Sequence, residues 1–164
     1  MILVAGTGNV FQTDDGFGPA VVARLSSATD PMPESVRVVD YGIRGMHLAY
    51  DLLGEWDALV LVDALPDHGE PGRVDVLEIG ASDVASGGQV DAHGMDPATV
   101  LATLAALGGT LPPRTVLVGC QVSDTDEGMG LTPVVDAAID QAVRHVQRQL
   151  DGLLAGAPAA TEVR

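Results

Sequence analysis

Apolar runs alternate with stretches of helical periodicity along most of this chain. Short continuous apolar runs that end in glycine or acidic residues are typical of buried strands in a parallel sheet. The runs predicted as strands are 2–5, 36–40, 58–62 and 115–120. Apolar residues at helical spacing predict helices over 16–27, 46–53, 97–107 and 132–150. This alternation predicts strand–helix units in which helices cover both faces of one sheet.

A fifth apolar segment has a different pattern. Val74, Val76 and Ile79 are interspersed with acidic residues, which is typical of a partly exposed strand. The turn-rich segment 66–72 before it is too short for a helical crossover, so we expect an antiparallel strand at the sheet edge. The predicted fold class is α/β, a three-layer α/β/α sandwich with a mixed five-stranded sheet and one antiparallel edge strand, of phosphorylase/hydrolase-like architecture.

The predicted helices each have one apolar face. In segment 46–53 the apolar positions are Met46, Ala49, Tyr50 and Leu53. In segment 97–107 they are Val100, Leu101, Leu104 and Leu107. Pro133, directly after Thr132, is expected to start one long final helix, because proline is favoured in a first helical turn. We expect these apolar faces to pack against the sheet.

Length and composition indicate one folded domain with an acidic surface. Of 164 residues, 46% are hydrophobic and 19% are charged, so the chain has enough apolar side chains to build a core. We assign residues 1–150 to a single domain and expect the tail 151–164 to be frayed. The formal net charge of −15 repels phosphate backbones and anionic lipids, so neither nucleic acid nor a membrane is an expected partner. The acidity fits a solvated surface, a basic protein or a metal cation.

The chain shows no sequence feature of a secreted or membrane-spanning protein. The single cysteine, Cys120, cannot form an internal disulfide, and Met1 opens directly into an apolar run without a basic region. Apolar stretches such as 58–62 are far shorter than the roughly 20 residues that cross a bilayer. We therefore expect a soluble, cytoplasmic protein.

Carboxylates follow several of the predicted strands. Loops at the carboxyl ends of parallel strands gather at one edge of a sheet, where ligands bind. Asp14 and Asp15 follow the first strand, Asp40 ends the second, Asp63 follows the third, and His93 precedes the third helix. A charged Asp63 after a run of apolar residues needs hydrogen bonds, a cation or water around it. Asp15 has a simpler alternative role, because a carboxylate before a helix can cap it.

Asp15, Asp63 and His93 together form a candidate metal site. Two carboxylates and one imidazole, with no fourth protein ligand, suit a borderline divalent ion such as Ni²⁺ or Zn²⁺ and leave coordination positions open for water or substrate. His47 and His68 also lie near predicted strand ends and are reserve ligands. His145, within the last helix, is expected at the surface.

Two other chemistries fit the sequence less well. Cys120 ends an apolar strand with no histidine nearby in the sequence, which favours a buried core residue over a nucleophile. The turn Gly6-Thr7-Gly8 could begin a dinucleotide-binding loop, with Asp40 as the ribose-binding acid. That pattern needs a third glycine where this chain has Phe11.

Several short motifs follow one another along residues 1 to about 150. The first are Gly6-Thr7-Gly8-Asn9, Asp14-Asp15-Gly16-Phe17-Gly18, Asp40-Tyr41-Gly42-Ile43 and Gly45-Met46. The later ones are Val62-Asp63-Ala64, Pro71-Gly72, His93 before a helix, and Gly130-Leu131-Thr132-Pro133. In this order they resemble the hydrogenase maturation proteases. The chain departs from the pattern with Asp15, where some members carry glutamate, and with Tyr41, where many have glycine.

The resemblance implies an aspartyl-type endopeptidase that removes a C-terminal extension from the precursor of the nickel-iron hydrogenase large subunit once nickel has been inserted. Nickel would then be supplied by the substrate, and no organic cofactor is expected. The family's ligands fall on Asp15, Asp63 and His93, and Asp40 is a candidate accessory acid or orienting group. Attack by water would be assisted either by the metal or by an aspartate acting as general base.

Two other functions stay open at this point. The same residues would serve a checkpoint chaperone that binds the nickel-loaded precursor without cutting it. A hydrolase of similar fold that acts on another peptide is the third possibility.

Overall fold

A five-stranded sheet forms the centre of the computed structural model, which describes residues 1–80, 82–83 and 97–156. The strands are β1 (Ile2–Thr7), β2 (Val36–Gly42), β3 (Ala58–Leu65), β4 (Val74–Glu78) and β5 (Arg114–Gln121). Their order in the sheet is β2-β1-β3-β5-β4. Four strands are parallel, whereas β4 pairs antiparallel with β5 at the edge. The predicted mixed sheet with one antiparallel edge strand is therefore confirmed.

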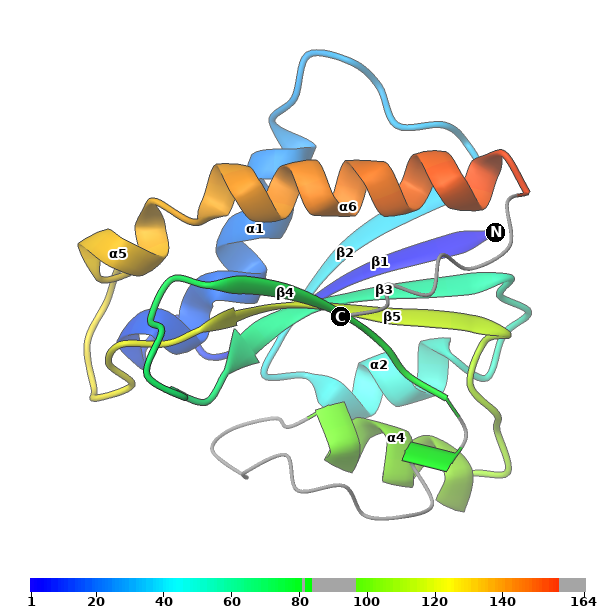
Figure 1. Ribbon diagram of the computed structural model, residues 1–164. Coiled ribbons are helices and arrows are strands. Elements are labelled where there is room, and N and C mark those ends of the chain that lie inside the picture. Colours follow the sequence, from blue (N-terminus) through cyan, green and yellow to red (C-terminus); the bar gives the residue numbers. More distant parts are fainter. Residues whose placement is uncertain (81, 84–96, 157–164) are drawn as a thin grey trace.

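Helices cover both faces of this sheet (Figure 1). In chain order they are the short 3-10 helix η1 (Thr13–Gly16), α1 (Phe17–Ser26), α2 (Gly45–Asp51), α4 (Pro97–Ala106), α5 (Pro133–Asp136) and α6 (Ile139–Leu154). Helices α1 and α6 lie on one face, and α2 and α4 lie on the other. This arrangement is the predicted three-layer sandwich.

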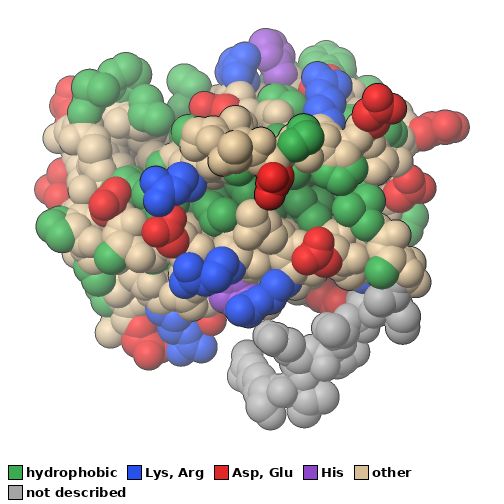
Figure 2. Space-filling view, turned by 90° about the horizontal axis from the view of Figure 1, so that it is seen from above, with side chains coloured by type: hydrophobic (Ala, Val, Ile, Leu, Met, Phe, Trp, Pro, Cys, Tyr) green, Lys and Arg blue, Asp and Glu red, His purple; other side chains and the backbone are tan. Residues whose placement is uncertain are grey.

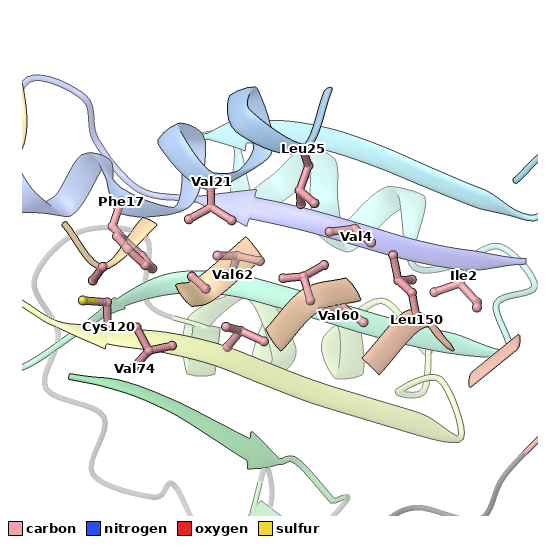
Figure 3. Packing of buried hydrophobic residues seen from close by; sticks show 14 of the residues in the cluster. Ile2, Val4, Phe17, Val21, Leu25, Val60, Val62, Val74, Cys120 and Leu150 are labelled. Atoms are coloured by element: carbon pink, nitrogen blue, oxygen red, sulfur yellow. The ribbon is translucent and has the colours of Figure 1, made fainter. Parts of the chain in front are cut away.

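Both faces of the central strands are buried, which explains their continuous apolar sequence. Successive side chains of a strand point to opposite faces, so Val60 and Val62 of β3 face α1 and α6. Leu59 and Leu61, between them, belong to the cluster beneath α2 and α4. Figure 3 shows Phe17 of α1 among the first group of side chains.

The buried face of α2 differs from the predicted one. Leu48 and Ala49 pack into the core, whereas Met46, Tyr50 and Leu53 are exposed. The segment carries two overlapping apolar stripes at helical spacing, and contact with α4 and the sheet selects the stripe that contains Leu48. The predicted orientation of this helix was wrong, and Met46 is left in contact with solvent at the start of α2.

The C-terminal segment forms two helices instead of the predicted single one. The Ala138 N–H bonds to the Val135 carbonyl oxygen, three residues back, and this tighter turn interrupts the helix between α5 and α6. Helix α6 then continues to Leu154, so the expected end at Leu150 was too early. In α4 the predicted core residue Leu107 lies beyond the helix end and is exposed, while the other three predicted positions are buried.

None of the helices in the described part of the chain has the length and apolar character that crossing a bilayer requires.

Candidate functional site

The start of α1 lies directly against the carboxyl ends of β1 and β3. A Cβ atom on Gly18 would be 2.2 Å from the carbonyl oxygen of Thr7 and 2.4 Å from that of Val62, so only glycine allows this approach. Because β1 and β3 are parallel neighbours, their carboxyl ends share one edge of the sheet. The structure thereby brings Asp15, just ahead of α1, and Asp63 of β3 to the same edge.

The glycine turn after β1 holds Asp15 in place. Gly8 has φ +136°, and a Cβ there would be 1.9 Å from the carbonyl oxygen of Asp15. The Asn9 N–H donates a hydrogen bond of 2.7 Å to Oδ2 of Asp15, and the other carboxylate oxygen accepts none from the residues that the structure describes. Helix α1 has no side-chain cap at Gly16, so the alternative reading of Asp15 as a helix cap was wrong.

Burial changes the proton affinity of Asp15. The residue is 8% exposed, and this burial raises the pKa of its carboxyl, although the hydrogen bond from Asn9 partly opposes the shift. A buried carboxylate binds a proton more tightly than an exposed one, and a cation bound to it would offset the same loss of solvation.

Asp63 lies inside the central strand, opposite Gly119 of β5. The strand continues to Leu65, whereas the sequence had placed its end before Asp63. The aspartate is 4% exposed, and its Oδ1 accepts a hydrogen bond of 2.8 Å from the Ala64 N–H. The buried carboxylate therefore has a hydrogen-bond donor beside it, which is one of the partners that the sequence required for a charge at this position.

Asp14, which sequence analysis gave no separate role, is the fully buried member of the aspartate pair. It accepts hydrogen bonds from the backbone N–H groups of Ser123, Asp124 and Thr132 at 2.7–3.0 Å, and from the Thr132 hydroxyl at 2.9 Å. Burial by itself would raise the pKa of Asp14, but these donors together lower it. Asp14 therefore fastens the segment before α5 to the turn that carries Asp15.

Asp40 lies at the exposed end of β2, opposite Gly6 of β1. Its Oδ1 accepts a hydrogen bond of 2.8 Å from the Gly42 N–H. Asp40 and Gly16 line the same hollow of about 340 Å³, so the structure places Asp40 near the turn that contains Asp15.

His93 lies outside the described residues, and the metal trio therefore remains a prediction. Within the residues that are described, there is no group of three or more His, Cys, Asp or Glu side chains that could hold a metal ion. The reserve candidates His47 and His68 are exposed, and the His68 N–H donates to the Gln121 side chain. His145 is half-buried, although the sequence had placed it at the surface.

Comparison with known proteins identifies the family. The sequence profile described as "Hydrogenase maturation protease" matches residues 19–149. The chain belongs to this family. It is similar to the Hydrogenase 2 maturation protease of Escherichia coli, with 31% identity over 146 residues that cover 88% of this chain and 87% of that protein.

Two further likenesses agree with the family. The chain is 35% identical over 151 residues to the hydrogenase expression/formation protein HupD of Rhodobacter capsulatus, which covers 91% of this chain and 70% of that protein. Its structure matches the hydrogenase maturating endopeptidase HybD from E. coli with a TM-score of 0.78 and 31% identity, over 92% of this chain and 91% of the other. This chain is thus a peptidase of the hydrogenase maturation type.

Two residues of this maturation protease belong to its core: the one that departs from the family pattern and the one that was considered as a nucleophile. Tyr41 is buried, and its hydroxyl donates a 2.5 Å hydrogen bond to Asp51 at the end of α2, so it supports the packing of that helix. Cys120 is fully buried, and burial raises the pKa of its thiol to about 12. A thiolate nucleophile is disfavoured there, as the sequence predicted.

Proposed function

We propose that this enzyme removes a C-terminal extension from the precursor of a nickel-iron hydrogenase large subunit, and that it recognises nickel already bound by that precursor. The observation that carries the proposal is that two buried aspartates, Asp15 and Asp63, belong to neighbouring elements at one edge of the sheet. The names of the relatives, which refer to hydrogenase maturation, support the choice of substrate.

In this proposal, the nickel is bound by Asp15, Asp63 and His93. Carboxylate oxygens and an imidazole nitrogen form a donor set that suits a borderline divalent ion. Oδ1 of Asp15 accepts no hydrogen bond from the described residues, so it can bind a cation without first breaking such a bond. The nickel enters and leaves with the precursor and is treated as part of the substrate.

The topology supports His93 as the third donor. The side chains of β3 alternate between the two faces, and Asp63 follows Leu59 and Leu61 to the face covered by α2 and α4. His93 precedes Pro97, the first residue of α4, by four positions in the sequence.

Cleavage follows from holding the precursor at this edge. With its nickel shared by the three side chains, the scissile peptide is positioned close to them, which contributes much of the rate increase. Water adds to the carbonyl carbon, the C–N bond breaks, and the leaving amine takes up a proton. An aspartate at this edge accepts the proton from the attacking water, and Asp40 orients the peptide from the neighbouring strand.

The test is intact-mass analysis of nickel-loaded and nickel-free precursor after incubation with the enzyme. We expect only the nickel-loaded precursor to be shortened. The Asp63→Asn variant should fold normally and leave the precursor intact, while Asp30→Asn, a change at an exposed loop residue, should process it as the wild type does.

Each other outcome contradicts a specific part of the proposal. Binding of the loaded precursor without any loss of mass would indicate the checkpoint chaperone. Shortening of the nickel-free precursor at the same rate would show that nickel is not recognised. Full activity of Asp63→Asn would remove this residue from the mechanism.

A further inference from the structure

A mostly apolar hollow of about 340 Å³ lies beside the candidate site. Its walls come from four segments that are distant in the sequence: the loop after β1, α1, the end of β2 and the loop before α5. Its apolar lining residues include Val10, Pro19, Ala20, Ala23 and Leu131. Gly16, which directly follows Asp15, also lines it, so the hollow adjoins the turn that carries Asp15.

Three exposed apolar side chains lie on the two loops that contribute to the wall of this hollow, and we call them the apolar rim. Val10 is 42% exposed, Phe11 59% and Met129 77%. The two loops that carry them are joined, because the Gly128 N–H donates to the Phe11 carbonyl oxygen at 2.9 Å. Apolar groups that are exposed together on fixed loops mark a surface that binds a partner.

The charge around the hollow is negative. Asp40 is the charged residue among those that line it, and the exposed Arg44, which donates a hydrogen bond to the Asp40 carbonyl oxygen, is a cation beside it. The loop that ends in Gly128 adds the exposed Asp124, Asp126 and Glu127. Figure 2 shows hydrophobic and acidic side chains together at its left-hand end, the end at which the parallel strands of Figure 1 terminate. A partner with positive charge complements this surface, whereas a second copy, which also carries a net charge of −15, is repelled.

We propose that the hollow and the apolar rim bind an extended segment of the precursor in which apolar residues stand next to Lys or Arg. This inference rests on the proposed function and names the part of the substrate that this surface recognises. The hollow is at the small end of the range of ligand pockets, roughly 300–1,000 Å³, so it accepts a few side chains of an extended chain and not a helix. A segment docked here reaches the turn that carries Asp15, at the carboxyl edge of the sheet.

The experiment compares processing kinetics of three proteins with nickel-loaded precursor. The rim variant carries Phe11→Ser and Met129→Ser. The control carries Leu53→Ser and Leu107→Ser, which are 45% and 40% exposed. These two residues follow α2 and α4 and precede β3 and β5, so they lie at the opposite edge of the sheet. The control therefore removes a similar apolar area far from the site.

The rim variant is expected to raise KM roughly tenfold while kcat stays within about a factor of two, because the rim binds ground state and transition state equally. The control should keep the wild-type KM. A melting curve checks that each variant is folded, and the single Met129→Ser variant, at the most exposed position, serves if the double variant is not.

A second arm tests the charge with two synthetic peptides of identical apolar residues, one with Arg and one with Glu beside them. The Arg peptide should inhibit the wild type competitively and inhibit the rim variant much less, whereas the Glu peptide should inhibit neither. Equal inhibition by both peptides would overturn the charge complementarity.

The outcomes separate this inference from the proposed function. If the wild type never shortens the precursor, the proposed function fails. If it does, and the rim variant has the KM of the control, the docking surface is refuted while the proposed function stands. A dimer that is lost in the rim variant would show that a second copy occupies the surface instead.

Discussion

Replacing the two adjacent aspartates one at a time should shift stability in opposite directions. Asp14 accepts hydrogen bonds from three backbone N–H groups and one hydroxyl, while Asp15 accepts one. The pKa of Asp14 is lowered and that of Asp15 is raised. Asp14→Asn should therefore destabilise the fold, and Asp15→Asn should leave it unchanged or stabilise it at neutral pH.

The size of the Asp14 effect follows from its hydrogen bonds. An asparagine turns an N–H₂ group toward some of the donors that the carboxylate accepts, and hydrogen bonds to charged groups contribute about 1.5–3 kcal/mol each. Loss of about two such bonds costs roughly 3–6 kcal/mol. For a domain of this size, each kcal/mol lowers Tm by about 2–4 °C, so we expect a decrease of roughly 6–24 °C.

The two variants should also differ in their pH dependence. A lowered pKa means that the stabilisation from ionised Asp14 is complete above its ordinary value of 3.8 and is lost as pH falls through the folded pKa. A raised pKa means that Asp15 stabilises most below 3.8, and that this contribution is lost as pH rises through its folded pKa. The difference in Tm between the wild type and Asp14→Asn should therefore become smaller as pH falls. The Tm of Asp15→Asn should increase relative to that of the wild type as pH rises toward neutral.

Thermal melting followed by circular dichroism at several pH values measures both effects, and precursor processing is assayed in parallel. Asp15→Asn should melt no lower than the wild type and yet lose activity. If Asp14→Asn melts like the wild type at pH 7, or if Asp15→Asn is the less stable of the two, the hydrogen bonds to Asp14 do not stabilise the fold as we expect.

Three other substitutions test separate features. Gly8→Ala should lower the free energy of unfolding by about 2 kcal/mol or more and displace Asp15, because the new Cβ atom meets the Asp15 carbonyl oxygen. The control Gly69→Ala, at φ +97° with nothing within 4 Å of its Cβ, has the backbone strain without such a contact. Equal melting temperatures and processing rates of the two variants would contradict the effect of this contact. Cys120→Ala should keep its processing rate, and a loss of activity would restore the cysteine as a nucleophile candidate. Tyr41→Phe should lower the free energy of unfolding in urea by about 0.5–1.5 kcal/mol without changing kcat/KM; a changed kcat/KM would connect this tyrosine to the site.

The strand pattern predicted the fold correctly because the parallel strands and the edge strand each have a distinct sequence pattern. The parallel strands are buried on both faces, so their sequences are apolar without interruption. The edge strand alternates with acidic residues and is antiparallel as expected. Helix α2 was oriented wrongly because Met46 and Leu48 belong to different apolar stripes, and only tertiary packing decides between them.

The candidate site was partly predictable. Asp63 stood out because a charge after an apolar run needs a special environment, and it is buried at the expected edge. The role of Asp14 was missed because its partners lie 109 to 118 residues further along the chain, where no local pattern marks them. Of an adjacent pair of aspartates, the sequence does not show which one faces the site.

In the proposed function, the nickel of the precursor is shared by Asp15, Asp63 and His93. Binding measurements test this by comparing the affinities of nickel-loaded and nickel-free precursor for the wild type and for Asp15→Asn, Asp63→Asn and His93→Ala. We expect the wild type to bind the loaded precursor more tightly and each substitution to remove most of this preference. An undiminished preference in any of the three variants would show that the substituted residue does not bind the nickel.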